Sequence, residues 1–151
     1  MLKKPLIYID TSIIGGLFDE EFRKESRALF EMAENGEITF LISDLILAEA
    51  EVAPQKILDS LNSLSEESFR TCYANEETVE LRDKYLAEKV VGPASKNDAH
   101  HVAIATVMRA DMIVSWNFRH IVHFEKIRAF NSVNIRCGYG RIEIFSPKEV
   151  V

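Results

Sequence analysis

Short apolar runs alternate with longer amphipathic segments along this chain, and this alternation constrains the fold more than any other feature. Continuous apolar runs of this kind are typical of strands buried on both faces of a parallel sheet. We predict strands at Leu6–Asp10, Ile38–Ile42, Phe69–Tyr73, Met112–Ser115 and Ile142–Phe145. The segments between them carry helical periodicity and capping residues. We predict a short turn or helix from Thr11 through Phe18, followed by longer helices at Glu20–Glu34, Asp44–Ala53, Pro54–Leu64, Glu76–Val91, Asp98–Arg109 and Val122–Phe130. The alternation predicts an α/β fold, a three-layer α/β/α sandwich with a mostly parallel central sheet.

The size and composition of the chain fit one compact domain. At 151 residues and 47% hydrophobic, the chain can bury a sizeable core, so we expect residues 1–151 to form a single domain. No apolar run approaches the roughly 18 residues that a membrane span needs. Because the segment Met1–Pro5 leads straight into the first predicted strand, we expect no signal peptide. Cys72 and Cys137 fit no paired motif, so reduced thiols and a cytoplasmic location are expected.

The charge balance argues mildly against a nucleic-acid partner. The formal net charge of −6 gives the chain no general electrostatic attraction to phosphate backbones. Basic residues do gather in the last third of the sequence, at Arg109, Arg119, Lys126, Arg128, Arg136 and Arg141. A nucleic-acid substrate therefore requires that basic residues cluster locally on the surface.

Three acidic residues, Asp10, Glu49 and Asp98, lie at the ends or on the apolar faces of predicted elements. Asp10 ends the first strand, and in sheets of this type ligands bind beyond the carboxyl ends of the strands. Glu49 shares its helix face with Leu45, Ile46, Val52 and Ala53, whereas the neighbouring Glu51 has a more mixed face and is expected to be solvated. Because a lone buried carboxylate is costly, several that converge indicate a bound cation.

Two of these acids, Asp10 and Asp98, also have a simpler explanation. Asp10 could cap the turn that follows it, and Asp98 could be an acid favoured by the dipole at the start of its helix. Asp111 precedes its strand and therefore falls at the opposite end of the sheet from the predicted site. The residue near the carboxyl end of that strand is Asn117, whose amide can orient a water or a phosphate but adds no charge.

Four segments together resemble the motifs of the PIN-domain family in their usual order. They are Tyr8–Ser12, Ser43–Glu49, Asp98–Ala105 and Ala110–Phe118. Within that family the chain looks most like VapC-type toxins of bacterial toxin–antitoxin pairs and their stand-alone relatives. The resemblance implies an RNase H-like α/β/α fold, Mg²⁺ or Mn²⁺ bound by acidic residues, and cleavage of single-stranded RNA. It places the family's acidic positions on Asp10, Glu49 and Asp98, and a fourth position, often Asp, on Asn117.

The resemblance also implies partners. An antitoxin protein is one possible partner, and VapC-like proteins usually form homodimers through helical faces. The segments Ala28–Ala33 and Leu58–Leu64 offer apolar helix surface for such a homodimer.

Phosphodiester hydrolysis needs an activated water, a neutralised phosphate and a stabilised leaving oxygen, which divalent cations supply. Asp10 is predicted as the central ligand with Asp98 beside it, while Glu49 binds through water or acts as the base. Candidate substrate-binding residues flank these acids: Thr11, Ser12, Ser115 and Trp116. Helix capping explains the hydroxyls of Thr11 and Ser12 equally well. For Trp116, packing is favoured over stacking on a base. His101 is expected to support a ligand from the second layer. His120 and His123 lack the further ligands that a zinc site needs.

Other classes of function fit less well. A phosphotransferase of the haloacid dehalogenase type needs a second acid two residues after Asp10, where this chain has Ser12. A dinucleotide-binding turn needs a third glycine after Gly15 and Gly16. The stronger alternative is a catalytically weakened PIN-fold protein that acts as an RNA- or antitoxin-binding module. Asn117 and the net acidity favour this alternative, and the three retained acids argue against it.

Overall fold

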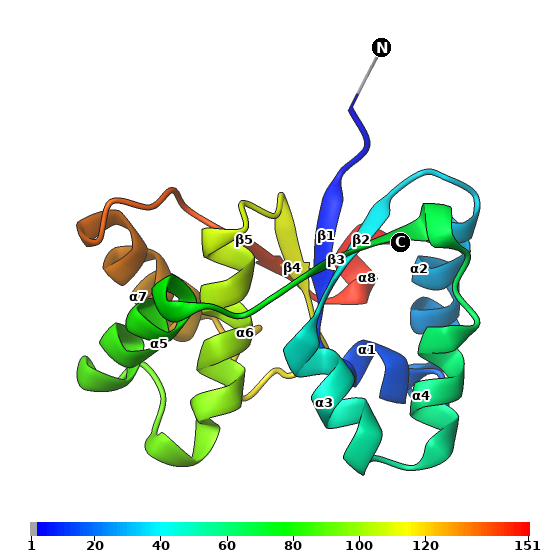
Figure 1. Cartoon of the computed structure of the whole chain (residues 1–151), viewed down its shortest axis with the longest axis horizontal. Coiled ribbons are helices and arrows are strands. Elements are labelled where there is room, and N and C mark those ends of the chain that lie inside the picture. Colours follow the sequence, from blue (N-terminus) through cyan, green and yellow to red (C-terminus); the bar gives the residue numbers. More distant parts are fainter. Residues whose placement is uncertain (1–2) are drawn as a thin grey trace.

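In the computed structural model, which describes residues 3–151, five parallel strands form one sheet in the order β3-β2-β1-β4-β5 (Figure 1). The strands are β1 (Leu6–Ile9), β2 (Thr39–Ser43), β3 (Phe69–Cys72), β4 (Met112–Val114) and β5 (Glu143–Phe145). Every pair of neighbours is parallel, and the register pairs Tyr8 with Leu41 on one side and with Ile113 on the other. All four residues of β1 are buried, as expected for the central strand of a covered parallel sheet.

Helices cover both faces of the sheet and complete the predicted three-layer sandwich (Figure 1). One layer contains α1 (Thr11–Gly16), α2 (Arg23–Glu34), α3 (Asp44–Val52), α4 (Gln55–Asn62) and α8 (Pro147–Val150). The other contains α5 (Glu76–Ala87), α6 (Lys96–Val107) and α7 (Phe124–Arg136). Two short 3₁₀ turns, η1 (Glu66–Ser68) and η2 (Pro93–Ser95), precede β3 and α6. Among the described residues no helix is long and apolar enough to span a membrane.

The sequence predicted the order of these elements, and the differences concern their ends. Helix α7 continues to Arg136, beyond the predicted end at Phe130, whereas α5 stops at Ala87 and Lys89 turns with φ of 58°. Val52 was assigned to an apolar buried face, and this was wrong, because Val52 ends α3 and is 89% exposed. Helix α8 and the two 3₁₀ turns had no counterpart in the prediction because they are too short to show periodicity.

The helix surfaces assigned to a homodimer are largely used inside the subunit. Leu29, Ala33, Leu61 and Leu64 are all buried in the protein's own core. These residues therefore do not supply the free apolar surface expected of them, and the homodimer itself stays a prediction.

Candidate active site at the carboxyl end of the sheet

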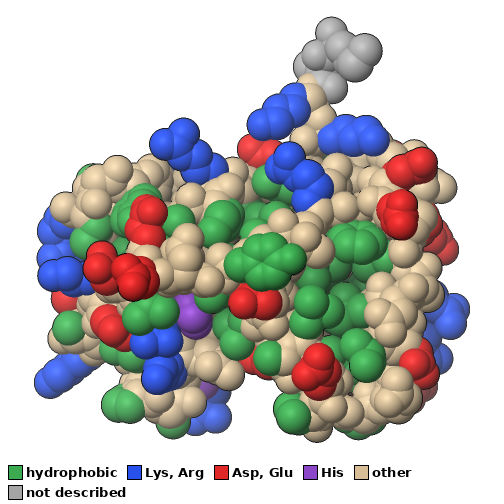
Figure 2. Space-filling view, viewed as in Figure 1, with side chains coloured by type: hydrophobic (Ala, Val, Ile, Leu, Met, Phe, Trp, Pro, Cys, Tyr) green, Lys and Arg blue, Asp and Glu red, His purple; other side chains and the backbone are tan. Residues whose placement is uncertain are grey.

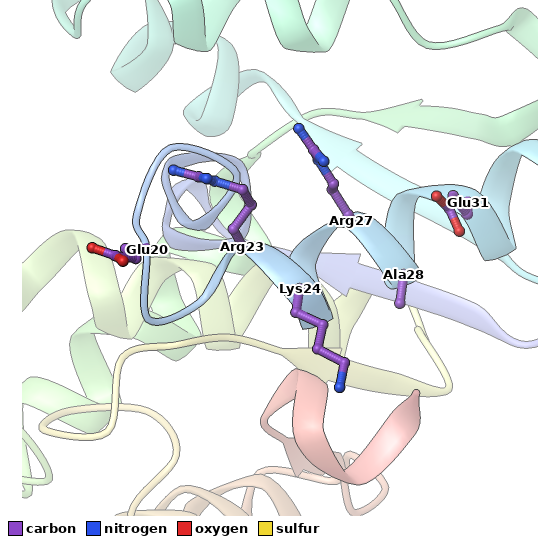
Figure 3. Close-up of a pocket in the computed structure, with 6 residues that line it drawn as sticks. All are labelled: Glu20, Arg23, Lys24, Arg27, Ala28 and Glu31. Carbon is purple, nitrogen blue, oxygen red and sulfur yellow. The ribbon is translucent and has the colours of Figure 1, made fainter.

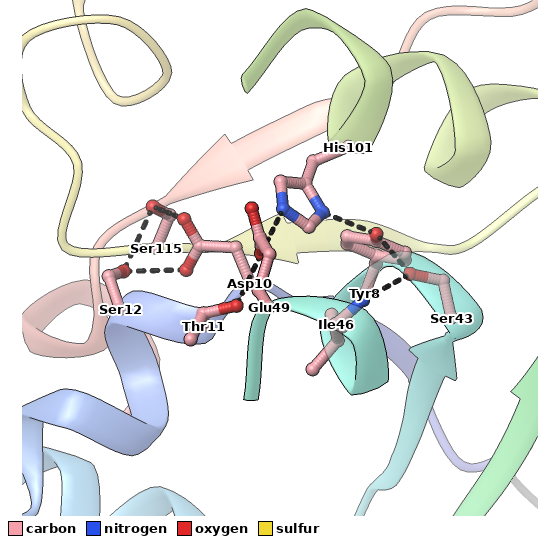
Figure 4. Close-up of polar contacts among 9 residues, drawn as sticks. All are labelled: Tyr8, Asp10, Thr11, Ser12, Ser43, Ile46, Glu49, His101 and Ser115. Atoms are coloured by element: carbon pink, nitrogen blue, oxygen red, sulfur yellow. Dashed lines mark hydrogen bonds and ion pairs between the residues drawn. The ribbon is translucent and has the colours of Figure 1, made fainter. Parts of the chain in front are cut away.

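Asp10 follows β1 at the point where the strand order reverses between β1 and β4, which is where ligands bind in open α/β sheets. Its side chain is 4% exposed. Asp10 occupies the N-cap position of α1 but makes no side-chain capping hydrogen bond, so the simple capping explanation fails. Instead its two oxygens accept hydrogen bonds from Ser12 Oγ at 2.5 Å and from Ser115 Oγ at 2.7 Å (Figure 4).

The surroundings of Asp10 leave its negative charge poorly compensated. Burial raises the pKa of the Asp10 carboxyl above its usual value; His101 and the two serine hydroxyls offset this in part, and the nearby Asp98 raises it further. Asp98 and His101 therefore both lie close enough to act on Asp10 electrostatically. A buried carboxylate that holds only hydroxyl partners gains more from a cation than an exposed one does.

Glu49 enters the same region from α3. Its Oε1 atom accepts hydrogen bonds from Thr11 Oγ1 at 2.5 Å and from His101 Nε2 at 2.9 Å (Figure 4). Burial opposes ionisation of Glu49, but the contacts with His101 and Thr11 outweigh it, so the pKa of the carboxyl lies below its usual value. The side chain is 26% exposed, and a side-chain hydrogen bond with Asn97 also lowers this pKa. Glu49 thus presents a partly exposed, ionised carboxylate in the region of Asp10 (Figure 4).

A buried hydrogen-bond chain holds His101 against Glu49. The His101 Nδ1 atom lies 2.6 Å from the Tyr8 hydroxyl, which lies 2.8 Å from Ser43 Oγ. Burial raises the pKa of Tyr8, so the phenol keeps its proton and can donate it to Nδ1, which leaves Nε2–H to donate to Glu49. Sequence reasoning anticipated the supporting role of His101 but missed Tyr8. The available signal was its place two residues before Asp10, on the same face of the strand.

Asp98 and Asn117 lie further along the same rim. Asp98, in the first turn of α6, holds His120 Nδ1 at 2.9 Å through Oδ2, and both side chains are partly exposed. The Asn117 Oδ1 atom accepts the His120 backbone N–H at 2.9 Å. Asn117 therefore stabilises the turn after β4, and His120 pairs with a carboxylate in place of the zinc considered above.

The serines and the tryptophan assigned to substrate form the wall behind Asp10. Ser12 Oγ accepts the Trp116 backbone N–H at 2.9 Å, so Ser12 links α1 to the end of β4. The Trp116 indole is 5% exposed, stacks on Phe22 at 4.2 Å between ring centroids and donates to Ser26 Oγ at 2.8 Å. The structure supports the packing interpretation of Trp116, because neither face of a buried indole is open to a base.

Two acids that sequence analysis set aside lie outside this cluster. Glu51 is exposed, as predicted. Asp111 accepts the backbone N–H of Leu6 at 2.6 Å, at the opposite end of the sheet from Asp10. The prediction that Asp111 lies away from the site is confirmed.

The donor set fits a cation held by few protein ligands. Among the described residues, no three Asp, Glu, His or Cys side chains lie close enough together to hold one ion. The assignment of Asp10, Glu49 and Asp98 to a single cation therefore stays a prediction. Mg²⁺ usually takes one or two carboxylates and completes its shell with waters and substrate oxygens. Asp10 with either neighbouring acid meets that requirement.

His100, next to His101 on α6, gives the fold a defined acid sensitivity. Burial, with Arg82 nearby, lowers the pKa of His100 from 6.5 to about 4. Between pH 6.5 and 4, His100 binds a proton in the unfolded chain but not in the folded one. The free energy of unfolding therefore falls as the pH decreases from 6.5 to 4. Replacing His100 with Gln should reduce the slope of the free energy of unfolding against pH in this window by up to about 1.4 kcal/mol per pH unit, as measured by urea denaturation at several pH values. The exposed His123 is the control, and an equal flattening in His123→Gln would contradict this explanation.

Comparisons with known proteins agree with this arrangement. The PIN domain family profile matches residues 7–119, which include Asp10, Glu49, Asp98 and Asn117. No curated protein matches the chain significantly in sequence. Among solved structures, VapBC2 from Rickettsia felis bound to a DNA fragment from their promoter is similar, with 15% identity, a TM-score of 0.56, and coverage of 93% of this chain and 98% of the other.

Two further structures share the fold to the same extent. DNA-bound VapBC from Salmonella typhimurium has 18% identity and a TM-score of 0.57 over 95% of this chain and 98% of that one. FitAcB from Neisseria gonorrhoeae has 13% identity and a TM-score of 0.57, and the similarity covers 94% of this chain and 98% of that one. The TM-scores and coverage show a common fold, and the family profile spans well over half of the sequence. The chain therefore belongs to the PIN domain family.

Proposed function

We propose that this protein is a VapC-like endoribonuclease that cleaves single-stranded RNA with Mg²⁺ or Mn²⁺. The observation that carries the proposal is the buried, poorly compensated carboxylate of Asp10 beside the ionised Glu49 at the carboxyl end of the sheet. Membership of the PIN domain family supports a nuclease, and the similarity to VapBC structures supports an antitoxin partner.

The residues divide the work of hydrolysis between them. Asp10 would hold the cation together with Asp98 or Glu49, and Ser12 and Ser115 fix the orientation of its carboxylate. A divalent ion supplies a more acidic bound water and neutralises the phosphate. Thr11 and His101 hold the Oε1 atom of Glu49, and the ionised, partly exposed carboxylate would accept a proton from the attacking water.

A gel assay of a labelled single-stranded RNA tests the proposal directly. We expect cleavage with Mg²⁺ or Mn²⁺, none with EDTA, and a loss of about 100-fold or more in Glu49→Gln, by analogy with the removal of one preorganised group in other enzymes. Glu51→Gln is the matched control, because Glu51 lies two residues away on the exposed face of the same helix. Equal activity of the two variants would contradict the role assigned to Glu49.

One observation favours a second candidate, a binding module without cleavage. Asn117 stands where the family often has a further acid, and its side-chain oxygen is used by the backbone of His120. Such a protein would bind RNA or an antitoxin with no requirement for metal. RNA binding that EDTA leaves unchanged, together with no cleavage under any metal, would support this candidate.

A further inference from the structure

Two hollows lie at the amino end of the sheet, opposite Asp10. The first, about 330 Å³, is lined by Arg109 and Arg141 together with the loop that contains Gly138, Tyr139 and Gly140. The second, about 280 Å³, is lined by Lys3, Lys4, Leu6, Thr39 and Arg70. Both hollows have a size compatible with a small ligand group.

The two hollows adjoin each other across β1 and β4. Leu6 lines the second hollow, and Ala110 lines the first. Asp111, which follows Ala110, donates its backbone N–H to Leu6 O at 2.8 Å and accepts the Leu6 N–H at 2.6 Å. The cationic residues therefore form one surface, which we call the amino-end basic surface: Lys3, Lys4, Arg70, Arg109 and Arg141. In Figure 2 blue side chains stand along the upper edge, where Figure 1 places the amino ends of the strands, and some red side chains lie near them.

The cations of this surface form no ion pairs with described residues, although the carboxylate of Asp111 lies between the two hollows. All five side chains belong to exposed residues, and within the described chain none of them pairs with a carboxylate. No Asp or Glu lines either hollow. The backbone N–H groups of Gly140 and Arg141 also make no hydrogen bond to any described residue. The surface thus combines guanidinium, ammonium and amide donors, and its one intervening carboxylate in residues 3–151, Asp111, accepts the Leu6 N–H and pairs with none of the five cations.

Hollows elsewhere on the protein differ in this respect. The hollow along α2 is lined by Arg23, Lys24 and Arg27 but also by Glu20 and Glu31, so that its charges are mixed (Figure 3). A hollow along α5 likewise combines Lys84 with Glu80 and Asp83. The two adjoining hollows at the amino end have cations as their only charged lining residues, although the chain carries a net charge of −6.

Helix ends explain only a part of this arrangement. Arg109 follows the carboxyl end of α6, where a cation offsets the helix dipole. Lys3, Lys4 and Arg70 lie before β1 and within β3, where no helix ends. The dipole therefore does not account for the surface as a whole.

We propose that the amino-end basic surface binds the phosphate backbone of single-stranded RNA at a distance from the cleavage site. The proposal rests on the RNA substrate proposed above. Arginine pairs suit phosphate because each guanidinium offers two parallel donors, and the free amides add further ones. When a long RNA is bound at the catalytic end of the sheet, its remaining nucleotides extend to the opposite end, where the amino-end basic surface binds their phosphates.

Fluorescence anisotropy with a labelled 20-nucleotide RNA in EDTA measures binding without cleavage. Each phosphate contact on a single strand contributes about 0.7 to the slope of log affinity against log salt. Arg109→Gln with Arg141→Gln should therefore lower the slope by about 1.4 and weaken binding about 25-fold at 0.1 M salt. Asp111→Asn keeps an acceptor for Leu6 but removes a charge between the hollows, and it should tighten binding.

The matched control is Lys24→Gln with Lys84→Gln, which removes two charges from hollows that also contain carboxylates. An equal loss in this control, or an unchanged salt slope in the arginine variant, would overturn the proposal. Displacement of the RNA by polyglutamate at lower concentration than by unlabelled RNA would also overturn it, in favour of an acidic polypeptide. Because the assay needs no cleavage, an inactive nuclease that still binds RNA here would refute the proposed activity and leave this surface supported.

Discussion

Replacing Asp10 with Asn is expected to reduce RNA cleavage to background while leaving the fold intact and raising its metal-free stability. The amide removes the charge that would hold the cation. Because burial raises the pKa of Asp10, its ionised form destabilises the folded protein at neutral pH, and this cost disappears as the pH falls through the folded pKa. The variant should therefore melt at a higher temperature than the wild type in EDTA at pH 7, and the difference should vanish in acid.

Asp111→Asn is the control for Asp10→Asn, since it changes an acid at the opposite end of the sheet. Its single-turnover rate at saturating RNA should equal that of the wild type. A structural Asp10 would give the reverse pattern: the Asn variant would lose roughly 1 kcal/mol as a lost cap does, and metal would not affect its activity relative to the wild type.

Gly16→Ala, which adds one methyl group, is expected to lower the free energy of unfolding by about 2 kcal/mol, a typical cost of overpacking a protein core. A Cβ atom there would lie 2.4 Å from Ser26 Oγ and 2.7 Å from Trp116 Nε1. Both atoms belong to the buried hydrogen bond behind the site, and the Trp116 backbone is held by Ser12, a partner of Asp10. Gly16→Ala should therefore lower cleavage as well as the urea midpoint.

The neighbouring Gly15 provides a matched control for this prediction. A Cβ atom at Gly15 would meet nothing within 4 Å, and the residue lies in the same helix, α1. Gly15→Ala should gain up to about 1 kcal/mol from helix propensity without affecting activity. If Gly16→Ala and Gly15→Ala were equally stable, Ser26 and Trp116 could move to accommodate the added methyl group, which would contradict the tight packing around Gly16.

The sequence predicted the fold well because its main signals are local. Buried strands appear as apolar runs, and the residue that follows such a run, Asp10 after Leu6–Ile9, reaches the carboxyl end of the sheet. The periodicity of α3 likewise distinguished Glu49 from Glu51. Element ends were less predictable, because the exposure of Val52 depends on how the chain leaves α3 before Pro54.

The contacts that organise the site were harder to predict because they join residues distant in sequence. Tyr8, Ser43 and His101 come from three different elements, and their hydrogen bonds appear only once β1, β2 and α6 are assembled. Trp116 shows the same limit, since its burial against Phe22 depends on the packing of α2. The basic surface at the amino end of the sheet could not be predicted either, because its residues, such as Arg70 and Arg141, are far apart in the sequence and come together only in the folded chain.

Calorimetric titration of Mn²⁺ at pH 7 into the wild type, Asp10→Asn and Asp111→Asn measures whether the carboxylate of Asp10 holds a divalent cation at the carboxyl end of the sheet. We expect a saturable binding signal for the wild type that Asp10→Asn loses and that Asp111→Asn retains. The same binding curve in the wild type and Asp10→Asn, or no binding by the wild type at millimolar Mn²⁺, would show that Asp10 does not hold such an ion.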